Sequence, residues 1–136
     1  NQEKELVALK TELYFIDPYI FLLKKRFGDG LKVSINVPDN MGELLIIPAA
    51  LQMLIENAIK HNVVSKQKPL HISLHISNNN CIVVTNNLQA KQTIEKSTEI
   101  GLQNIIKRYR LVSHQDVSVN KDTDSFIVTL PLISAN

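Results

Sequence analysis

Two short runs of alternating apolar residues, joined by a polar turn, constrain the fold of this chain most strongly. Apolar residues occupy every second position from 70 to 76, and Ile82 and Val84 repeat the pattern after the polar segment 77–80. Alternation places apolar side chains on one face of a strand, and consecutive serine and asparagine residues are typical of turns. The sequence therefore predicts a β-hairpin that buries one of its faces.

The other elements follow from the same reasoning, because apolar residues spaced three and four apart predict helices and alternating ones predict strands. In chain order, the sequence predicts a helix over 6–27, a strand over 31–37, a helix over 48–63, the hairpin, a helix over 102–112, and two closing strands around 117–119 and 126–130. This order predicts an α+β fold: a two-layer sandwich in which a mixed, mostly antiparallel sheet carries helices on one face, preceded by an N-terminal helix.

The N-terminal helix has the apolar spacing of a helix that packs against another helix, from Leu6 to Phe27. Asp17 and Pro18 interrupt the pattern. Proline lacks a backbone donor and clashes with the preceding turn, so we expect a kink or a restart near Pro18, with Asp17 as N-cap. We divide the chain into this connecting helix, residues 1–28, and a domain over residues 29–136.

Composition limits the classes of function. The chain has 136 residues, enough for a single core, and no apolar run approaches the roughly 20 residues of a membrane-spanning helix. The single cysteine, Cys81, excludes an internal disulfide and a multi-cysteine zinc site. A net charge of +2 spread along the chain, with 5% aromatic residues, argues against nucleic acid as a partner.

The predicted helix over 48–63 is amphipathic, and its polar face carries chemically useful side chains. Glu56, Asn57 and Lys60 share the arc opposite the apolar one, with His61 at its edge. One interpretation is a helix face in contact with water. The other is a binding site, because an asparagine oxygen suits Mg²⁺ and a lysine ammonium suits a phosphate.

The segment 87–100 is polar and has no clear period. A structureless segment of this length is unusual in a compact domain, and such segments are commonly lids or binding loops. We therefore predict a lid before the helix over 102–112.

The polar helix face resembles a known motif. Residues 51–62, LQMLIENAIKHN, closely resemble the N box of LytS-type sensor histidine kinases, which share an ATP-binding fold with gyrase, Hsp90 and MutL. Residues 100–105, IGLQNI, followed by Arg108, resemble the second glycine box of that family. Residues 130–132 and 26–29 are similar to its closing strand and its helix-to-domain junction. The resemblance covers nearly the whole chain and implies the Bergerat-type ATP-binding fold.

The resemblance also implies roles for the residues of the N box. Asn57 would be the Mg²⁺ ligand, and Lys60 would approach the terminal phosphates of ATP. His61 would line the nucleotide pocket. Glu56 is a candidate for assisting proton transfer.

The second glycine box would contribute to the same site. Gly101 and Leu102 would bring backbone donors to the phosphates at a helix N-terminus, where the helix dipole favours negative charge. Asn104 matches a nucleotide-binding position of the family, and Arg108 matches another position in this helix. For these two residues, exposed or packing roles remain the alternative.

Three positions, in two motifs, depart from the family pattern. The first glycine box normally reads aspartate, any residue, glycine, and its aspartate accepts a hydrogen bond from the adenine amino group. This chain has Asn86 and Leu88 at those two positions. Asn86 still offers an amide oxygen, whereas Leu88 lacks the backbone freedom of glycine. Glu99 stands where the family usually has glycine, and a carboxylate there would repel a triphosphate.

The chain contains no Asn-Pro-His-Phe-type motif, in which the family carries its phosphorylated histidine. His71 and His75 share one face of a predicted strand, and could suggest a metal pair or an outward sheet face. Cys81 begins a strand and is most simply a packing residue.

The resemblance implies the ATP-binding domain of a two-component sensor histidine kinase. This domain would transfer the γ-phosphoryl group of ATP, with Mg²⁺, to a histidine on a missing upstream helix, and a response regulator would then take it. The implied whole protein is a homodimer anchored in the inner membrane, with this domain in the cytoplasm and residues 1–28 ending its dimerisation helix. A catalytically silent interaction module of the same fold is the alternative, and a serine kinase or ATPase is a third.

Overall fold

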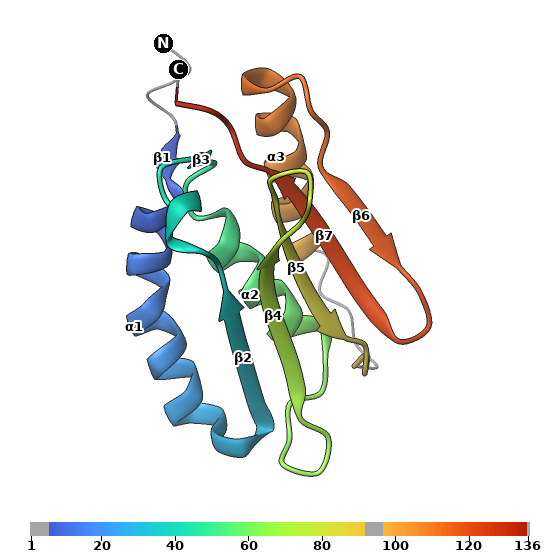
Figure 1. Cartoon of the computed structure of the whole chain (residues 1–136). Coiled ribbons are helices and arrows are strands. Elements are labelled where there is room, and N and C mark those ends of the chain that lie inside the picture. Colours follow the sequence, from blue (N-terminus) through green and yellow to red (C-terminus); the bar gives the residue numbers. More distant parts are fainter. Residues whose placement is uncertain (1–5, 92–96, 136) are drawn as a thin grey trace.

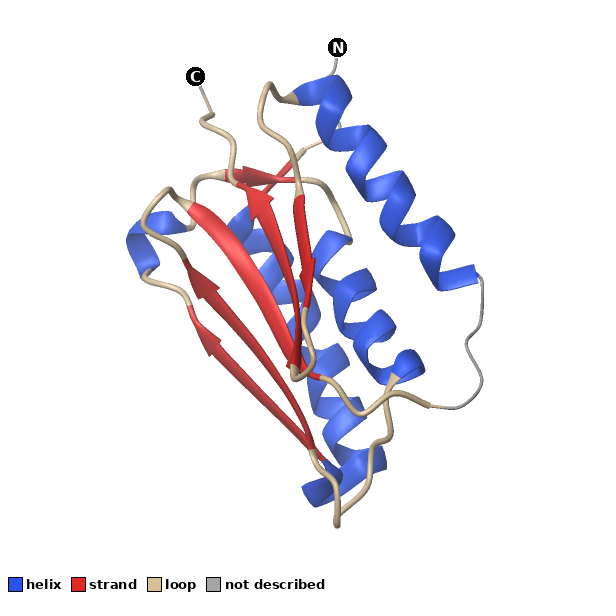
Figure 2. Ribbon diagram, turned by 90° about the vertical axis from the view of Figure 1, so that its right-hand side faces the viewer, coloured by secondary structure: helices blue, strands red, loops and turns tan. Residues whose placement is uncertain are grey.

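The structure, a computed structural model, describes residues 6–91 and 97–135. A five-stranded sheet forms one layer, and the helices lie against one of its faces (Figures 1 and 2). In spatial order the strands are β2 (Leu31–Asn36), β4 (Leu70–Ile76), β5 (Cys81–Asn87), β7 (Ser125–Pro131) and β6 (Ser118–Lys121). β2 runs parallel to β4, and the other neighbouring strands are antiparallel. The predicted α+β sandwich with a mixed, mostly antiparallel sheet is confirmed.

The helical layer consists of α1 (Leu9–Phe27), α2 (Ala50–His61) and α3 (Ser97–Val112). A second, two-stranded sheet pairs β1 (Val7–Ala8) with β3 (Leu45–Ile46). Ile133 bridges to Leu45, so the segments near the two chain ends flank β3. The sequence predicted helix at residues 7–8, where the structure has β1, because the apolar spacing does not show where the helix begins.

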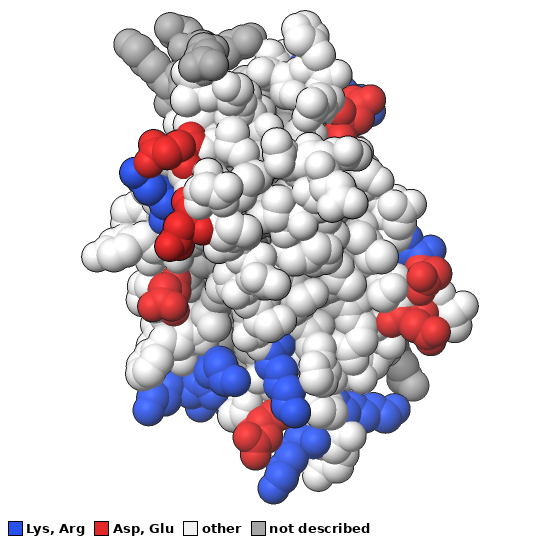
Figure 3. Space-filling model, viewed as in Figure 1, with Lys and Arg blue, Asp and Glu red and all other residues white. Residues whose placement is uncertain are grey.

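The predicted β-hairpin is confirmed: it consists of β4 and β5, with Leu74 paired to Val84. Their inward residues join the core together with the buried face of α2, and Ile72, Ile82 and Leu51 are among the fully buried side chains. The opposite face of the sheet meets solvent. Figure 3, seen from that side, shows few charged side chains over the middle of the sheet.

Helix α1 runs through Pro18 without ending, so the predicted restart there, with Asp17 as an N-cap, is wrong. The proline leaves the carbonyl of Tyr14 without its intrahelical donor, but Tyr14, Asp17 and Pro18 lie on the exposed side of the helix, where water satisfies that carbonyl. The other side of α1 packs against this domain through Leu9 and Ile16. The division of the chain at residue 28 stays a prediction.

Helix α3 begins at Ser97, five residues before the predicted helix. The sequence of its first turn has no apolar period, and Ile100 is 63% exposed, so periodicity could not predict helix there. The end of the predicted lid over 87–100 therefore belongs to α3, from residue 97 on. Residues 92–96 of the predicted lid lie outside the described residues. Helix α2 begins at Ala50 and ends at His61, slightly inside the predicted 48–63.

Candidate functional site

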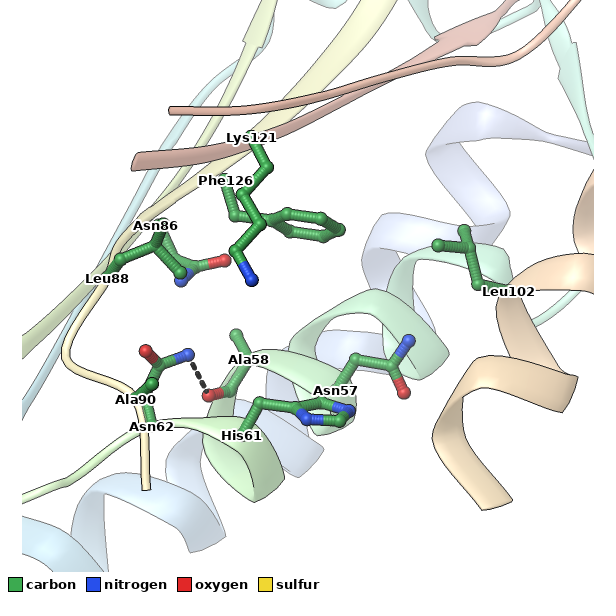
Figure 4. Close-up of a pocket in the computed structure, with 10 residues that line it drawn as sticks. All are labelled: Asn57, Ala58, His61, Asn62, Asn86, Leu88, Ala90, Leu102, Lys121 and Phe126. Carbon is green, nitrogen blue, oxygen red and sulfur yellow. Dashed lines mark hydrogen bonds between the residues drawn. The ribbon is translucent and has the colours of Figure 1, made fainter. Parts of the chain in front are cut away.

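A cavity of about 230 Å³ lies between α2 and the inner face of the sheet (Figure 4). Helix α2, the end of β5 and the segment after it, β6, β7 and one residue of α3 contribute side chains. Sites for drug-sized ligands usually occupy roughly 300–1,000 Å³. This cavity therefore suits a nucleobase better than a whole nucleotide, whose phosphates would extend out of it.

Helix α2 places Asn57, Ala58 and His61 at the cavity. Leu54 and Ile55 anchor the helix in the core, and this orients the polar side chains towards the sheet and α3. Asn57 is 8% exposed, so it is not part of a face in contact with water. Figure 4 shows the Asn57 amide and the His61 ring side by side on α2. Both side chains line the cavity, and their role in binding a ligand stays a prediction.

The start of α2 is fixed from outside the helix. Ala49, its N-cap, has a left-handed backbone with a φ of 66° and no side-chain cap. The Glu12 carboxylate of α1 accepts hydrogen bonds from the backbone N–H groups of Ala49 (3.0 Å) and Leu51 (3.1 Å). Glu12 is 5% exposed, and so a buried residue of α1 sets where the N-box helix begins.

Asn62 fastens the segment after β5 to the end of α2. Its Nδ2 donates to the carbonyl of Ala58 at 2.8 Å, and its Oδ1 accepts from the backbone N–H of Gln89 at 2.8 Å. Asn62 also pairs with Ala90 in an isolated bridge, and both residues line the cavity. These contacts close the cavity on the side of the predicted lid. Sequence reasoning had not singled out Asn62.

Asn86 lies at the end of β5 and is 4% exposed. Its Nδ2 donates to the carbonyl oxygen of Asn87 at 2.8 Å. A carbonyl can only accept, so this hydrogen bond fixes the orientation of the amide and directs Oδ1 the other way, into the cavity (Figure 4). Asn86 therefore presents an acceptor, the group needed to receive an amino group of a ligand.

Leu88 also lines the cavity, as part of its apolar wall. Among the described residues, only Ala49 and Asn80 are non-glycine residues with a positive φ. Leu88 thus adopts an ordinary backbone conformation, and its backbone N–H donates to the carbonyl of Asp124 at 2.9 Å. Replacement of glycine at this position causes no backbone strain in this fold.

Phe126 and Lys121 complete the cavity from the last two strands, and sequence reasoning missed both. Strand pairing sets Asn86 opposite Phe126, and Phe126 opposite Lys121. The three residues therefore form a row across β5, β7 and β6 on the inner face of the sheet. The alternation within the closing strands could have revealed the row, since Phe126 stands two residues before Val128 and shares its face.

The structure does not bring Glu56 or Lys60 to the cavity. Glu56 lies on the side of α2 that faces α1, where it accepts a hydrogen bond from Gln52 at 3.4 Å and one from the Tyr19 hydroxyl. Burial first, and then the Glu56 charge and hydrogen bond, raise the pKa of Tyr19 to about 12. Lys60 is exposed. The helical wheel had grouped these residues with Asn57, but only Asn57 and His61 turn towards the sheet.

The second glycine box is also placed differently from the prediction. Leu102 lines the cavity, but Gly101 lies in the second turn of α3, so it is not at the helix N-terminus as predicted. A Cβ at Gly101 would overlap the sulfur of Met53 in α2, so this glycine permits the close approach of two helices. Asn104 is exposed and lies outside the cavity. The side chain of Glu99 lies outside what the structure describes.

Metal binding can be tested against the ligands that are present. The part of the chain that the structure describes has no group of three or more histidine, cysteine or acidic residues that could hold a metal ion. Asn57 supplies a single neutral oxygen. Mg²⁺ commonly uses few protein ligands and keeps water and phosphate oxygens as the rest. The site therefore fits Mg²⁺ that arrives with a polyphosphate, with Asn57 as its protein ligand.

Comparison with known proteins shows sequence relatives among bacterial sensor proteins. The chain is 34% identical over 89 residues to the sensor protein LytS of Oceanobacillus iheyensis, an alignment that covers 63% of this chain and 15% of that protein. It is 26% identical to the sensor histidine kinase BtsS of Escherichia coli over 146 aligned positions, covering 97% of this chain and 25% of that protein. The chain thus spans a quarter or less of these relatives. No protein-family model matches it.

Solved structures share the fold. The catalytic domain of histidine kinase ThkA matches with a TM-score of 0.59 at 12% identity, covering 96% of this chain and 99% of that one. The mycobacterial sensor histidine kinase MprB matches with a TM-score of 0.56 at 14% identity, covering 95% and 97%. These matches establish the fold of a histidine kinase catalytic domain. No helix among the described residues is long and apolar enough to cross a membrane.

Proposed function

We propose that this chain is the ATP-binding domain of a LytS-type sensor histidine kinase, and that it binds ATP with Mg²⁺ and donates its γ-phosphoryl group to a histidine outside the chain. One observation carries the proposal: the N-box residues Asn57 and His61 and the inward-facing oxygen of Asn86 line a single cavity. They come from two elements that only the tertiary fold brings together.

The adenine base would occupy the cavity, and the phosphates would extend towards α3. Asn86 Oδ1 would accept a hydrogen bond from the adenine amino group. The Phe126 ring and Leu88 provide apolar contacts for the base. This orientation directs the ribose and phosphates past His61 and Asn57, towards Leu102.

Bound Mg²⁺ would neutralise charge on the phosphate oxygens during transfer. Asn57 would hold it through the amide oxygen, and waters and phosphates would provide the other ligands. The protein itself mainly positions the nucleotide and excludes water from the base, because phosphoryl transfer depends largely on positioning and charge neutralisation. Such a role needs few residues on this domain.

The remaining partners lie outside this chain. The acceptor histidine would sit on a separate helix upstream of β1 and α1, and a response regulator would take the phosphoryl group from it. We further propose that the whole protein is a membrane-anchored homodimer with this domain in the cytoplasm. The printed names of the sequence relatives, a sensor protein and a sensor histidine kinase, support the signalling role.

Calorimetric titration with a non-hydrolysable ATP analogue tests the proposal. We expect binding that requires Mg²⁺ for full affinity and that falls about tenfold or more in Asn57→Ala. Asn36→Ala, an exposed asparagine on β2, is the matched control and should bind like the unmodified chain. Absence of heat at millimolar nucleotide, from a folded sample, would refute ATP binding by this chain.

A catalytically silent module of the same fold is the second candidate. It is favoured by Asn86, which lacks the charge of the family's aspartate, and by Lys60, which is exposed. The position of Gly101 inside α3 also favours it, because its backbone N–H is not at a helix end. The same titration separates the two candidates, since the silent module predicts no Mg²⁺-dependent binding.

A further inference from the structure

Lys121 lines the cavity, and the proposed contacts to ATP and Mg²⁺ do not use it. It lies on the edge strand β6, opposite Phe126, and therefore on the face of the sheet that carries the core. Lys121 is exposed, so its apolar stem lies along the inner face of the edge strand while its ammonium stays accessible to solvent and to a ligand. Among the described residues, no side chain is recorded as ion-paired or hydrogen-bonded to Lys121. Its side chain instead lines the cavity.

The direction of the Lys121 side chain relates it to Asn86. The two residues are separated by Phe126 in the row across β5, β7 and β6. In Figure 4 the Lys121 ammonium and the Asn86 oxygen both point into the cavity, beside the Phe126 ring. The cavity wall therefore offers one fixed acceptor and one charged donor next to an aromatic surface.

We propose that Lys121 is a base-recognition residue, whose ammonium donates a hydrogen bond to the ring nitrogen beside the adenine amino group. The proposal rests on the nucleotide-binding function above and adds a second contact to the base. Adenine presents an amino donor next to a ring-nitrogen acceptor, which matches the Asn86 acceptor and the Lys121 donor. Guanine presents an oxygen where adenine has its amino group, so that oxygen would face the Asn86 oxygen.

A different role for Lys121 is protection of the edge strand, because inward-pointing charges discourage pairing between sheet edges. A contact to the phosphates is a further possibility for a lysine. These roles differ in which ligands would lose affinity when the Lys121 ammonium is removed. Adenosine lacks phosphates and therefore distinguishes base recognition from phosphate binding.

The test measures dissociation constants of adenosine and of the ATP analogue by NMR titration, for the unmodified chain and for Lys121→Met. Methionine keeps an unbranched apolar stem and removes the charge. We expect the affinity for both ligands to fall by the same factor, about tenfold, since the contact involves only the base. The preference for ATP over GTP should shrink as well. Lys32→Met, on the opposite edge strand, is the matched control and should change neither affinity.

Two other outcomes of this titration would overturn the proposal. A loss for the ATP analogue alone would assign Lys121 to the phosphates and overturn the proposal. Unchanged affinities would leave Lys121 as an edge-protecting charge and overturn it too. The analogues 1-deazaadenosine and 7-deazaadenosine each lack one ring nitrogen beside the amino group, so one of them should bind both proteins equally, and a persistent difference with both would contradict the contact. If the unmodified chain binds neither ATP nor adenosine, the proposed function itself fails.

Discussion

The Glu12 carboxylate in α1 accepts a hydrogen bond from the backbone N–H of Leu51 in α2, over 3.1 Å. The same carboxylate holds the N–H of Ala49, so one buried side chain caps a helix that starts in a different part of the sequence. Helix α2 carries Asn57 and His61, and α1 therefore determines the position of the candidate nucleotide site. The contact joins the helix nearest the proposed phospho-acceptor to the helix that would bind ATP.

Removal of this cap should destabilise the domain. Glu12→Ala leaves the buried N–H of Leu51 and the part-buried N–H of Ala49 without their charged partner, and we expect a loss of about 2–3 kcal/mol in the free energy of unfolding. Chemical denaturation measures it. Glu43→Ala is the control, because the exposed ion pair of Glu43 with Lys10 should contribute less than about 1 kcal/mol. Equal losses in the two variants would contradict a capping role for Glu12.

The left-handed conformation of Ala49 predicts a substitution that stabilises the domain. A non-glycine residue at a φ of 66° is strained by its Cβ, so Ala49→Gly should stabilise the domain by about 0.5–1 kcal/mol. Ala50→Gly, at the first position of α2, should instead destabilise it, because glycine loses more conformational freedom in a helix. Thermal unfolding of the two variants compares them directly. A destabilised Ala49→Gly protein would mean that the strain is absent.

The contact between Gly101 and Met53 should appear as coupling between two mutations. In the unmodified chain, a Cβ at position 101 meets the Met53 sulfur, which cancels the advantage of alanine in a helix. In a Met53→Ala background the space is free, and Gly101→Ala should then stabilise the domain by about 1 kcal/mol. A double-mutant cycle by denaturation measures the difference. Identical effects in both backgrounds would show that the two helices do not approach closely.

Glu56 should act on stability through Tyr19 and leave nucleotide binding unaffected. A double-mutant cycle with Tyr19→Phe and Glu56→Gln should give a coupling of about 1 kcal/mol. The pKa of Tyr19 is raised by folding to about 12, so the contribution is present below pH 10 and is lost as the pH rises towards 12. Titration of Glu56→Gln with the ATP analogue provides the second measurement. A marked loss of affinity in Glu56→Gln would show that Glu56 contributes to nucleotide binding.

The turn before β7 should be sensitive to acid. The Asp122 carboxylate accepts hydrogen bonds from the backbone N–H groups of Asp124 and Ser125, both at 2.8 Å, and these lower the pKa of Asp122 from its ordinary 3.8. A depressed pKa stabilises the fold above the ordinary value, and this contribution is lost as the pH falls through the folded-state pKa. The stability difference between the unmodified chain and Asp122→Ala should therefore be constant from neutral pH to about 4, and shrink below it.

Measurement of melting temperatures across this pH range checks the prediction. Asp17→Ala, on the exposed side of α1, is the control for a simple loss of negative charge. A difference for Asp122→Ala that grows in acid would reverse the expected sign and exclude the carboxylate as the stabilising form.

The sequence by itself determined the elements whose periodicity is long and regular. Alternation in β4 and β5 fixed the hairpin, since an apolar side chain at every second position can be buried on only one face of a strand. The N-box string identified α2 and selected Asn57 and His61, because the residue types themselves carry the chemistry. The fold class followed from the order of the elements.

Tertiary structure decided which neighbours the polar side chains meet. The helical wheel could not separate Asn57 from Glu56, because their neighbours, the cavity for Asn57 and Tyr19 of α1 for Glu56, are distant in the sequence. The sequence of the first turn of α3 has no apolar period, so local patterns did not show that Gly101 lies inside a helix. Lys121 joined the site only through strand pairing with Phe126. Long-range pairing and packing depend on the whole chain, and for that reason these features could not be read from local patterns.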